Sequence, residues 1–284
     1  MLTKSLMRVV LAILAVSSAI FAQTAGSSPA QFQNHSNVLD AHQILKLSVA
    51  ATKRNWQARD QYAYTERDED RRLNSLGQVK SENIDLTRTI PVNGARFAQL
   101  VEHNGHPPSA EEQRKSDEDL EELKHETPME RTIRLGKERE NRSFLDQVLH
   151  AFDFQLIGEE VVDGRLAYVV QATPHVGYQA HGKYGKMFSK VEGKLWVDKE
   201  DFGWIKVDGQ VTQAFSMGLF VARVQRGSHI SLEEMRVGHD VWVPNRLEVR
   251  ASARILCLKS LNIDRILTYS DYHRVMDGPY SSSR

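Results

Sequence analysis

The sequence has very little cysteine and no excess of charge of either sign. Its 284 residues include one cysteine, Cys257, so no disulfide can form within the chain. The apolar neighbours of Cys257 predict a buried, unreactive thiol. Lysine and arginine together number 37, as do aspartate and glutamate. Because a balanced chain has no net field that attracts nucleic acid, we expect no nucleic-acid partner.

The motifs of the common hydrolases and zinc enzymes are also missing, since there is no His-Glu-x-x-His pair, Gly-x-Ser-x-Gly elbow or cysteine cluster. Residues 177–183 have the spacing of a phosphate-binding loop, but Tyr184 stands where serine or threonine would hold magnesium. Two close histidine pairs match no familiar metal site: His103 with His106, and His175 with His181. Three carboxylates are expected to form a turn between strands: Asp198, Glu200 and Asp201. Nothing in these motifs therefore marks a catalytic or metal-binding residue, and we expect no cofactor and no metal.

The first residues indicate export. Lys4 and Arg8 precede or open an apolar run over residues 9–20, and the small residue Ala22 follows it. This is the pattern of a secretory signal peptide, and the run is short for a membrane span. We predict a signal peptide over residues 1–22, a flexible leader over 23–38 and a periplasmic or secreted mature protein. An uncleaved membrane anchor is the alternative.

The remaining chain predicts one α+β domain over residues 39–276, followed by a disordered tail over 277–284. Residues 40–59 and 144–152 have the apolar spacing of amphipathic helices. Strand alternation fills most of the rest, and it is clearest over residues 246–258, where apolar and polar side chains alternate. At least eight strands, joined mainly by hairpin turns, predict a large, curved antiparallel sheet with helices covering its concave face.

A charged insertion interrupts the pattern at residues 107–142. Of the 32 residues from Glu111 to Arg142, 19 are charged, with both signs interleaved. This favours an exposed helix stabilised by i,i+4 pairs, or partial disorder. The segment is either a solvated insertion or a mobile lid or partner-binding arm.

Large apolar side chains concentrate in the second helix and in the strands that follow it. They form either an ordinary core or an apolar ligand cavity. The residues expected to line such a cavity are Phe144, Val148, Phe152, Tyr168, Trp196, Phe215 and Phe220. A one-residue slip in strand register would turn Trp196 outward and bring Leu195 in.

Three segments resemble a known superfamily: residues 162–174 (VDGRLAYVVQATP), 193–199 (GKLWVDK) and 205–207 (IKV). They are similar to the LolA-like superfamily of envelope lipoprotein carriers and related sigma-factor regulators. The resemblance implies an unclosed, strongly curved β-barrel capped by helices, an acyl-chain cavity between the two, and no catalytic residues. The chain departs from the small carriers in its length and in its charged insertion.

Three functional hypotheses follow. The leading one is a non-catalytic envelope protein that binds or carries a lipid, an acyl chain or a lipid-modified protein, with transient membrane contact. The alternative is an interaction or sensor protein of the same fold that binds an envelope protein through its surface. A secreted hydrolase is the third.

Overall fold

The computed structural model describes residues 39–142, 144–179, 182–217, 222–255 and 259–275. The predicted signal peptide, leader and tail lie outside the described residues, as do Cys257 and the predicted cavity residue Phe220.

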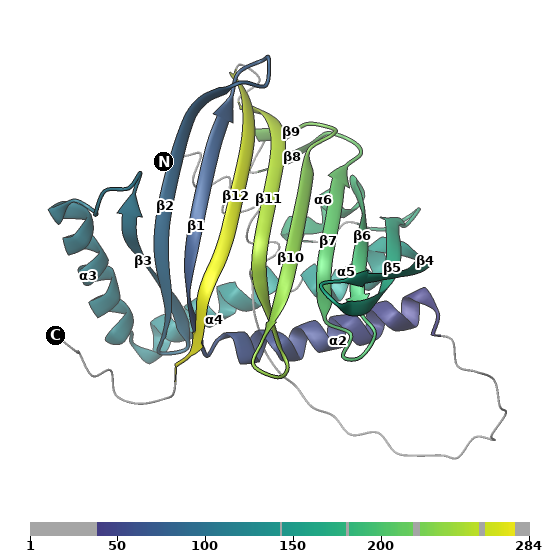
Figure 1. Ribbon diagram of the computed structural model, residues 1–284, viewed down its shortest axis with the longest axis horizontal. Helices are drawn as coiled ribbons and strands as arrows, with labels where there is room; N and C mark the ends of the chain where they lie inside the picture. The colour runs from purple at the N-terminus through teal and green to yellow at the C-terminus, as the bar shows by residue number, and fades with distance from the viewer. Residues whose placement is uncertain (1–38, 143, 180–181, 218–221, 256–258, 276–284) are drawn as a thin grey trace.

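A single antiparallel sheet organises the described chain (Figure 1). Twelve strands are described in it: β1 (Tyr62–Leu73), β2 (Val79–Val92), β3 (Ala95–His103), β4 (Phe152–Val162), β5 (Arg165–Pro174), β6 (Val191–Asp198), β7 (Trp204–Val211), β8 (Phe215–Met217), β9 (Ala222–Val224), β10 (His229–Val237), β11 (Val241–Ile255) and β12 (Lys259–Arg274). They follow the order β3, β2, β1, β12, β11, β10, β7, β6, β5, β4, with the β8–β9 hairpin beside β11. The edges β3 and β4 are not joined, so the predicted large, unclosed antiparallel sheet with helices is confirmed.

Turn chemistry explains several of the hairpins. Asn93 and Asp163 adopt positive φ angles of 49°, and the glycine after each does likewise. Such backbone angles suit Asn-Gly and Asp-Gly turns, which match the twist of the flanking strands. They join β2 to β3 and β4 to β5.

Helix α2 (Ala41–Arg59) begins at Asp40, as predicted, and runs across one end of the strands from β4 toward β1 (Figure 1). Asp40 accepts a hydrogen bond from the backbone N–H of Gln43, whose side chain accepts one in return. This reciprocal pair satisfies donors that a helix start leaves free. Helix α5 (Phe144–Ala151) packs beside α2.

The two faces of the sheet differ. We call the face that packs against α2 and α5 the inner face; it carries Leu195 and Val207, which contact the main apolar core, and continues through Leu247 and Val249. The opposite, outer face carries a smaller cluster around Ile205. Register explains the division, because side chains alternate between the faces along each strand.

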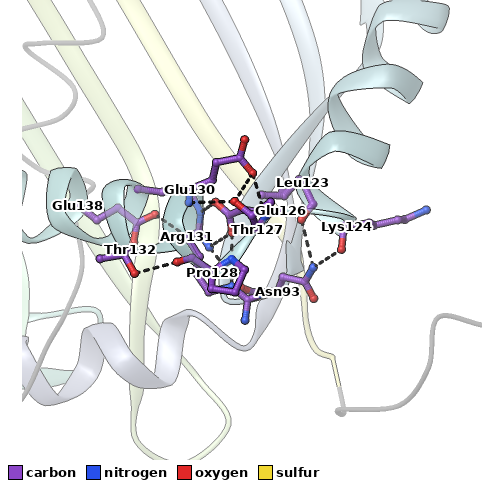
Figure 2. A network of polar contacts seen from close by, with 11 residues as sticks. Asn93, Leu123, Lys124, Glu126, Thr127, Pro128, Glu130, Arg131, Thr132 and Glu138 are labelled. Carbon is purple, nitrogen blue, oxygen red and sulfur yellow. Dashed lines mark hydrogen bonds and ion pairs between the residues drawn. The ribbon is translucent and has the colours of Figure 1, made fainter.

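The charged segment forms two helices, α3 (Ala110–Lys124) and α4 (Pro128–Arg142), with no buried residue in either. Their junction is fastened to the β2–β3 turn (Figure 2). The Asn93 side chain donates to the carbonyl oxygens of Leu123 and Lys124 at 3.1 and 2.9 Å. Arg134 donates to both carboxylate oxygens of Glu126 at 2.8 Å. The corner is therefore held by specific contacts.

The segment over residues 174–189 contains a short helix, α6 (Gly182–Phe188). Its glycines hide the helical pattern from sequence reasoning, because glycine is a weak helix former. Phe188 on α6 is buried in the core that α5 also joins, which stabilises the helix by packing.

Candidate functional site: an apolar hollow and a polar pocket

An apolar hollow of about 220 Å³ lies between the inner face of the sheet and helices α5 and α6. Helix α5 supplies Phe144 and Val148, and α6 supplies Met187 and Phe188. The sheet side is formed by aromatic and aliphatic residues of several strands: Phe152, Phe154, Ala172, Leu195, Trp204, Val207, Val211, Phe215, Val224, Ile230, Val249 and Ala251. Nearly all of its surface is apolar, as in typical small-molecule sites.

Two facing glycines leave room on the sheet side of the hollow. Gly193 on β6 and Gly209 on β7 are paired in register, and both line the hollow. A Cβ atom at Gly193 would lie 2.3 Å from the carbonyl oxygen of Asp208, so no larger residue fits there without backbone movement. A Cβ at Gly209 would lie 3.2 Å from a methyl group of Ile230. The pair removes two side chains where a continuous apolar layer would otherwise form.

A register irregularity places Trp204 on the inner face. Trp196 pairs with Lys206, whereas the next residue, Val197, pairs with Trp204, so one extra residue lies on β7. Such a bulge changes which side chains point to each face. Trp204 therefore joins the main core, while Ile205 packs on the outer face.

The structure brings four of the seven predicted cavity residues together around the hollow: Phe144, Val148, Phe152 and Phe215. Tyr168 packs against the same core but does not line the hollow. Trp196 lies on the outer face, where its indole N–H donates to Glu160 at 2.7 Å, and Leu195 takes the inner position. Phe220 lies outside the described residues.

Sequence reasoning did not select several of the lining residues, including Phe154, Trp204, Val207 and Val249. Phe154 and Val249 could have been found from alternation along strands. Phe154 lies two residues after Phe152, and Val249 lies within the clearest alternating strand. The position of Trp204 depends on the bulge, for which the sequence gives no signal.

A second cavity, which we call the polar pocket, has a volume of about 280 Å³. It lies between α2, the β6–β7 turn and the β10–β11 turn, and its lining residues are Ala51, Thr52, Arg54, Asn55, Ala58, Asp201, Gly203, Trp204, Glu234, Asp240 and Trp242. Trp204 is the residue that it shares with the apolar hollow.

Polar contacts hold the walls of the polar pocket. Asn55 on α2 donates to the Trp242 carbonyl oxygen at 2.6 Å and accepts from the Trp242 backbone N–H at 2.8 Å. Arg59 pairs with Glu234 at 2.5 Å, and both side chains are buried. The Trp242 indole N–H donates to Asp201. These contacts fix α2 against β10 and β11, so the pocket has a defined shape.

Charged side chains occupy the inner face farther along the sheet. Glu66 and Asp68 on β1 pair in register with Tyr269 and Leu267 on β12, and Arg265 forms a two-pronged ion pair with Asp68. Burial, followed by the neighbouring Asp68 carboxylate, raises the pKa of Glu66 to about 7, against the lowering influence of Arg265 and of a hydrogen bond from Tyr269. Glu66 therefore changes charge near neutral pH.

The carboxylates predicted to form a turn do so. One oxygen of Asp198 accepts hydrogen bonds from the backbone N–H groups of Glu200 and Asp201, and Arg165 pairs with the same carboxylate. Burial acts to raise the pKa of Asp198, but the hydrogen bonds from Arg165 and from the two backbone groups outweigh it, so this pKa is lowered. An ionised, fully engaged carboxylate suits a structural role.

Within the described ranges, no cluster of three or more histidine, cysteine, aspartate or glutamate side chains has metal-binding geometry. The search for helices of sufficient length and apolarity to cross a membrane found none in this part of the chain.

No protein-family profile and no curated protein sequence matches the chain. Solved structures do match, at low identity. A LolA superfamily protein from Nitrosomonas europaea is 12% identical, covers 85% of this chain and 96% of its own, and has a TM-score of 0.33. A putative outer membrane lipoprotein-sorting protein domain from Vibrio parahaemolyticus is 10% identical, with coverages of 84% and 95% and a TM-score of 0.34. The structure of the MucA/MucB complex of Pseudomonas aeruginosa is 13% identical, covers 78% of this chain and 94% of its own, and has a TM-score of 0.23. One of these solved structures, the Nitrosomonas europaea protein, belongs to the LolA superfamily that the sequence resembles.

Proposed function

We propose that this chain is an exported, non-catalytic protein of the cell envelope that binds a lipid or acyl chain in the apolar hollow. The observation that carries the proposal is the composition of that hollow, in which apolar side chains from two helices and several strands face a space of about 220 Å³. The signal-peptide pattern of residues 1–22 supports export.

The energetics favour a hydrocarbon ligand. Burying one methylene group contributes about 0.8 kcal/mol, so a segment of about six methylenes would gain roughly 5 kcal/mol before the costs of association. A charged or strongly polar ligand would lose its hydration in this hollow without gaining hydrogen bonds, which disfavours it.

The test is direct measurement of binding. Native mass spectrometry of the protein purified from an envelope fraction should show an additional mass that solvent extraction removes. The extracted protein should then bind a fluorescent fatty acid with a stoichiometry of one. Protein that carries no lipid and leaves the fluorescence of the fatty acid unchanged contradicts the proposal.

A protein partner is the second candidate, favoured by the surface of α4. Met129 and Ile133 lie one helical turn apart and are 75% and 50% exposed. Apolar side chains exposed side by side on a helix are common at protein interfaces. Under this alternative, replacing both with serine would abolish capture of an envelope protein while leaving fatty-acid binding unchanged.

A further inference from the structure

Trp204 stands at the boundary between the apolar hollow and the polar pocket, since it lines both. The residue is only 7% exposed. Its indole Nε1 is buried and, among the described residues, makes no hydrogen bond. The bulge that places Trp204 on the inner face thus also buries a hydrogen-bond donor without an acceptor.

A second buried donor lies on the facing helix. The Ser48 side chain on α2 is fully buried, and its hydroxyl has no hydrogen-bond partner in the part of the chain that the structure describes. Ser48 precedes Thr52 by four residues, so the two occupy the same face of α2, and Thr52 lines the polar pocket. Buried polar groups are nearly always hydrogen-bonded in folded proteins. Ser48 lines neither cavity, whereas Trp204 lines both, so the Trp204 indole N–H, which has no partner among the described residues, indicates an acceptor that arrives with a ligand.

We propose that the Trp204 indole N–H donates a hydrogen bond to the carbonyl oxygen of an acyl group. The hydrocarbon chain then lies in the apolar hollow and the polar headgroup in the polar pocket. This inference rests on the proposed function, because it assigns the orientation and linkage chemistry of the ligand in that site.

The charges around the polar pocket favour a neutral carbonyl, that of an ester or amide, over a free carboxylate. The pocket is lined by three carboxylates, Asp201, Glu234 and Asp240, and by one guanidinium, Arg54. Arg59 pairs with Glu234, and Arg236 lies 3.7 Å from Asp201. Three acidic groups are therefore balanced by three basic ones. No excess of positive charge remains to replace the hydration that a carboxylate would lose.

Three lipids that share a twelve-carbon chain test the inference. 1-Monolauroylglycerol carries an ester, 1-O-dodecylglycerol replaces the ester with an ether and so lacks only the carbonyl, and laurate is a free acid. Affinities are measured by displacement of the neutral fluorescent probe N-phenyl-1-naphthylamine. We expect the ester to bind about 5–10-fold more tightly than the ether, the ratio that one added hydrogen bond gives, and laurate to bind more weakly than the ester at pH 8.

Variants connect this preference to the indole donor. Trp204→Phe removes the N–H and should bring the ester-to-ether ratio close to one. Trp196→Phe removes an indole N–H on the outer face and should leave the ratio unchanged. In a proton–nitrogen spectrum, the indole signal that Trp204→Phe eliminates should move when the ester binds and stay in place when the ether binds.

The outcomes separate this inference from the function on which it rests. Equal binding of ester and ether by the unmodified chain overturns the carbonyl contact and leaves acyl-chain binding intact. Tighter binding of laurate than of the ester overturns the preference for a neutral carbonyl. Failure of all three lipids to displace the probe overturns the proposed function itself.

Discussion

Replacing Val148 with tryptophan separates a ligand-binding hollow from a solid core. Val148 lies on α5, is 9% exposed and faces the hollow between Phe144 and Phe152. If the hollow is open space, the indole enters it without compressing its neighbours. If the space is closed by side chains, the larger group overpacks the core and lowers the free energy of unfolding by about 1–3 kcal/mol.

The effect on binding can be estimated from the volume that the indole takes. If it excludes about three methylenes of an acyl chain at about 0.8 kcal/mol each, binding weakens by roughly 2.4 kcal/mol, or about 50-fold. A fluorescent fatty acid reports the affinity, and urea denaturation of the same sample without ligand reports the stability. We expect a large loss of affinity with a change in stability under about 1 kcal/mol.

Val243→Trp is the matched control. Val243 is 1% exposed and lines neither cavity, so the same enlargement there should cost the full overpacking penalty. A Val148→Trp protein that loses as much stability as Val243→Trp but binds the fatty acid normally would refute the assignment of the hollow as a ligand site.

Three further predictions concern the polar contacts. Because the pKa of Glu66 is about 7 in the folded chain and lower when unfolded, its contribution to stability is present at low pH and is lost as pH rises toward 7. Between pH 4.5 and 8, the free energy of unfolding of the unmodified chain, measured by urea denaturation, should fall by up to about 3 kcal/mol relative to that of Glu66→Gln. A free energy of unfolding that depends on pH in the same way in both proteins would contradict this. Glu234→Gln should lower the free energy of unfolding by about 3–5 kcal/mol by leaving Arg59 buried without its counter-charge, whereas the double variant Arg59→Met with Glu234→Leu should lose much less. Asn93→Ala should release the end of α3 and so speed proteolytic cleavage within residues 110–142, with little change in global stability. Asn104→Ala is the control and should not speed this cleavage, because the Asn104 side chain instead accepts a hydrogen bond from the Ile84 backbone N–H.

Much of the fold could be predicted because its signals are local. The capping residue Asp40, the Asp-Gly and Asn-Gly turns and the alternation over residues 246–258 each determine structure within a few neighbours. Strand β11 nevertheless starts earlier than predicted, at Val241. Pro244 lies within this strand and has no backbone N–H to donate, so the sequence predicts that the strand is interrupted there. It is accommodated because it pairs with Glu234 at an irregularity in the β10–β11 register.

The candidate site was less predictable, because its geometry depends on interruptions of those local patterns. The hollow needs Gly193 and Gly209 opposite each other on neighbouring strands, and pairing between strands is not visible in one sequence. It also needs the bulge that turns Trp204 inward while Trp196 faces outward. Alternation alone predicts which residues share a face within one strand, but a single inserted residue exchanges the faces from that point onward.

Strand order also limits the hollow on one side. Val249 on β11 lines the hollow, and its partner in register on the next strand, β12, is Arg265. Arg265 is engaged by Asp68 from β1, so at this position the inner face changes from apolar to charged within one strand spacing. A hydrocarbon chain that extended past β11 would have to cover this ion pair and remove its remaining hydration, which costs more than the added methylenes contribute. Under the proposed function, a bound chain would therefore run along the β6–β7 side of the sheet, toward Trp204, rather than across to β1.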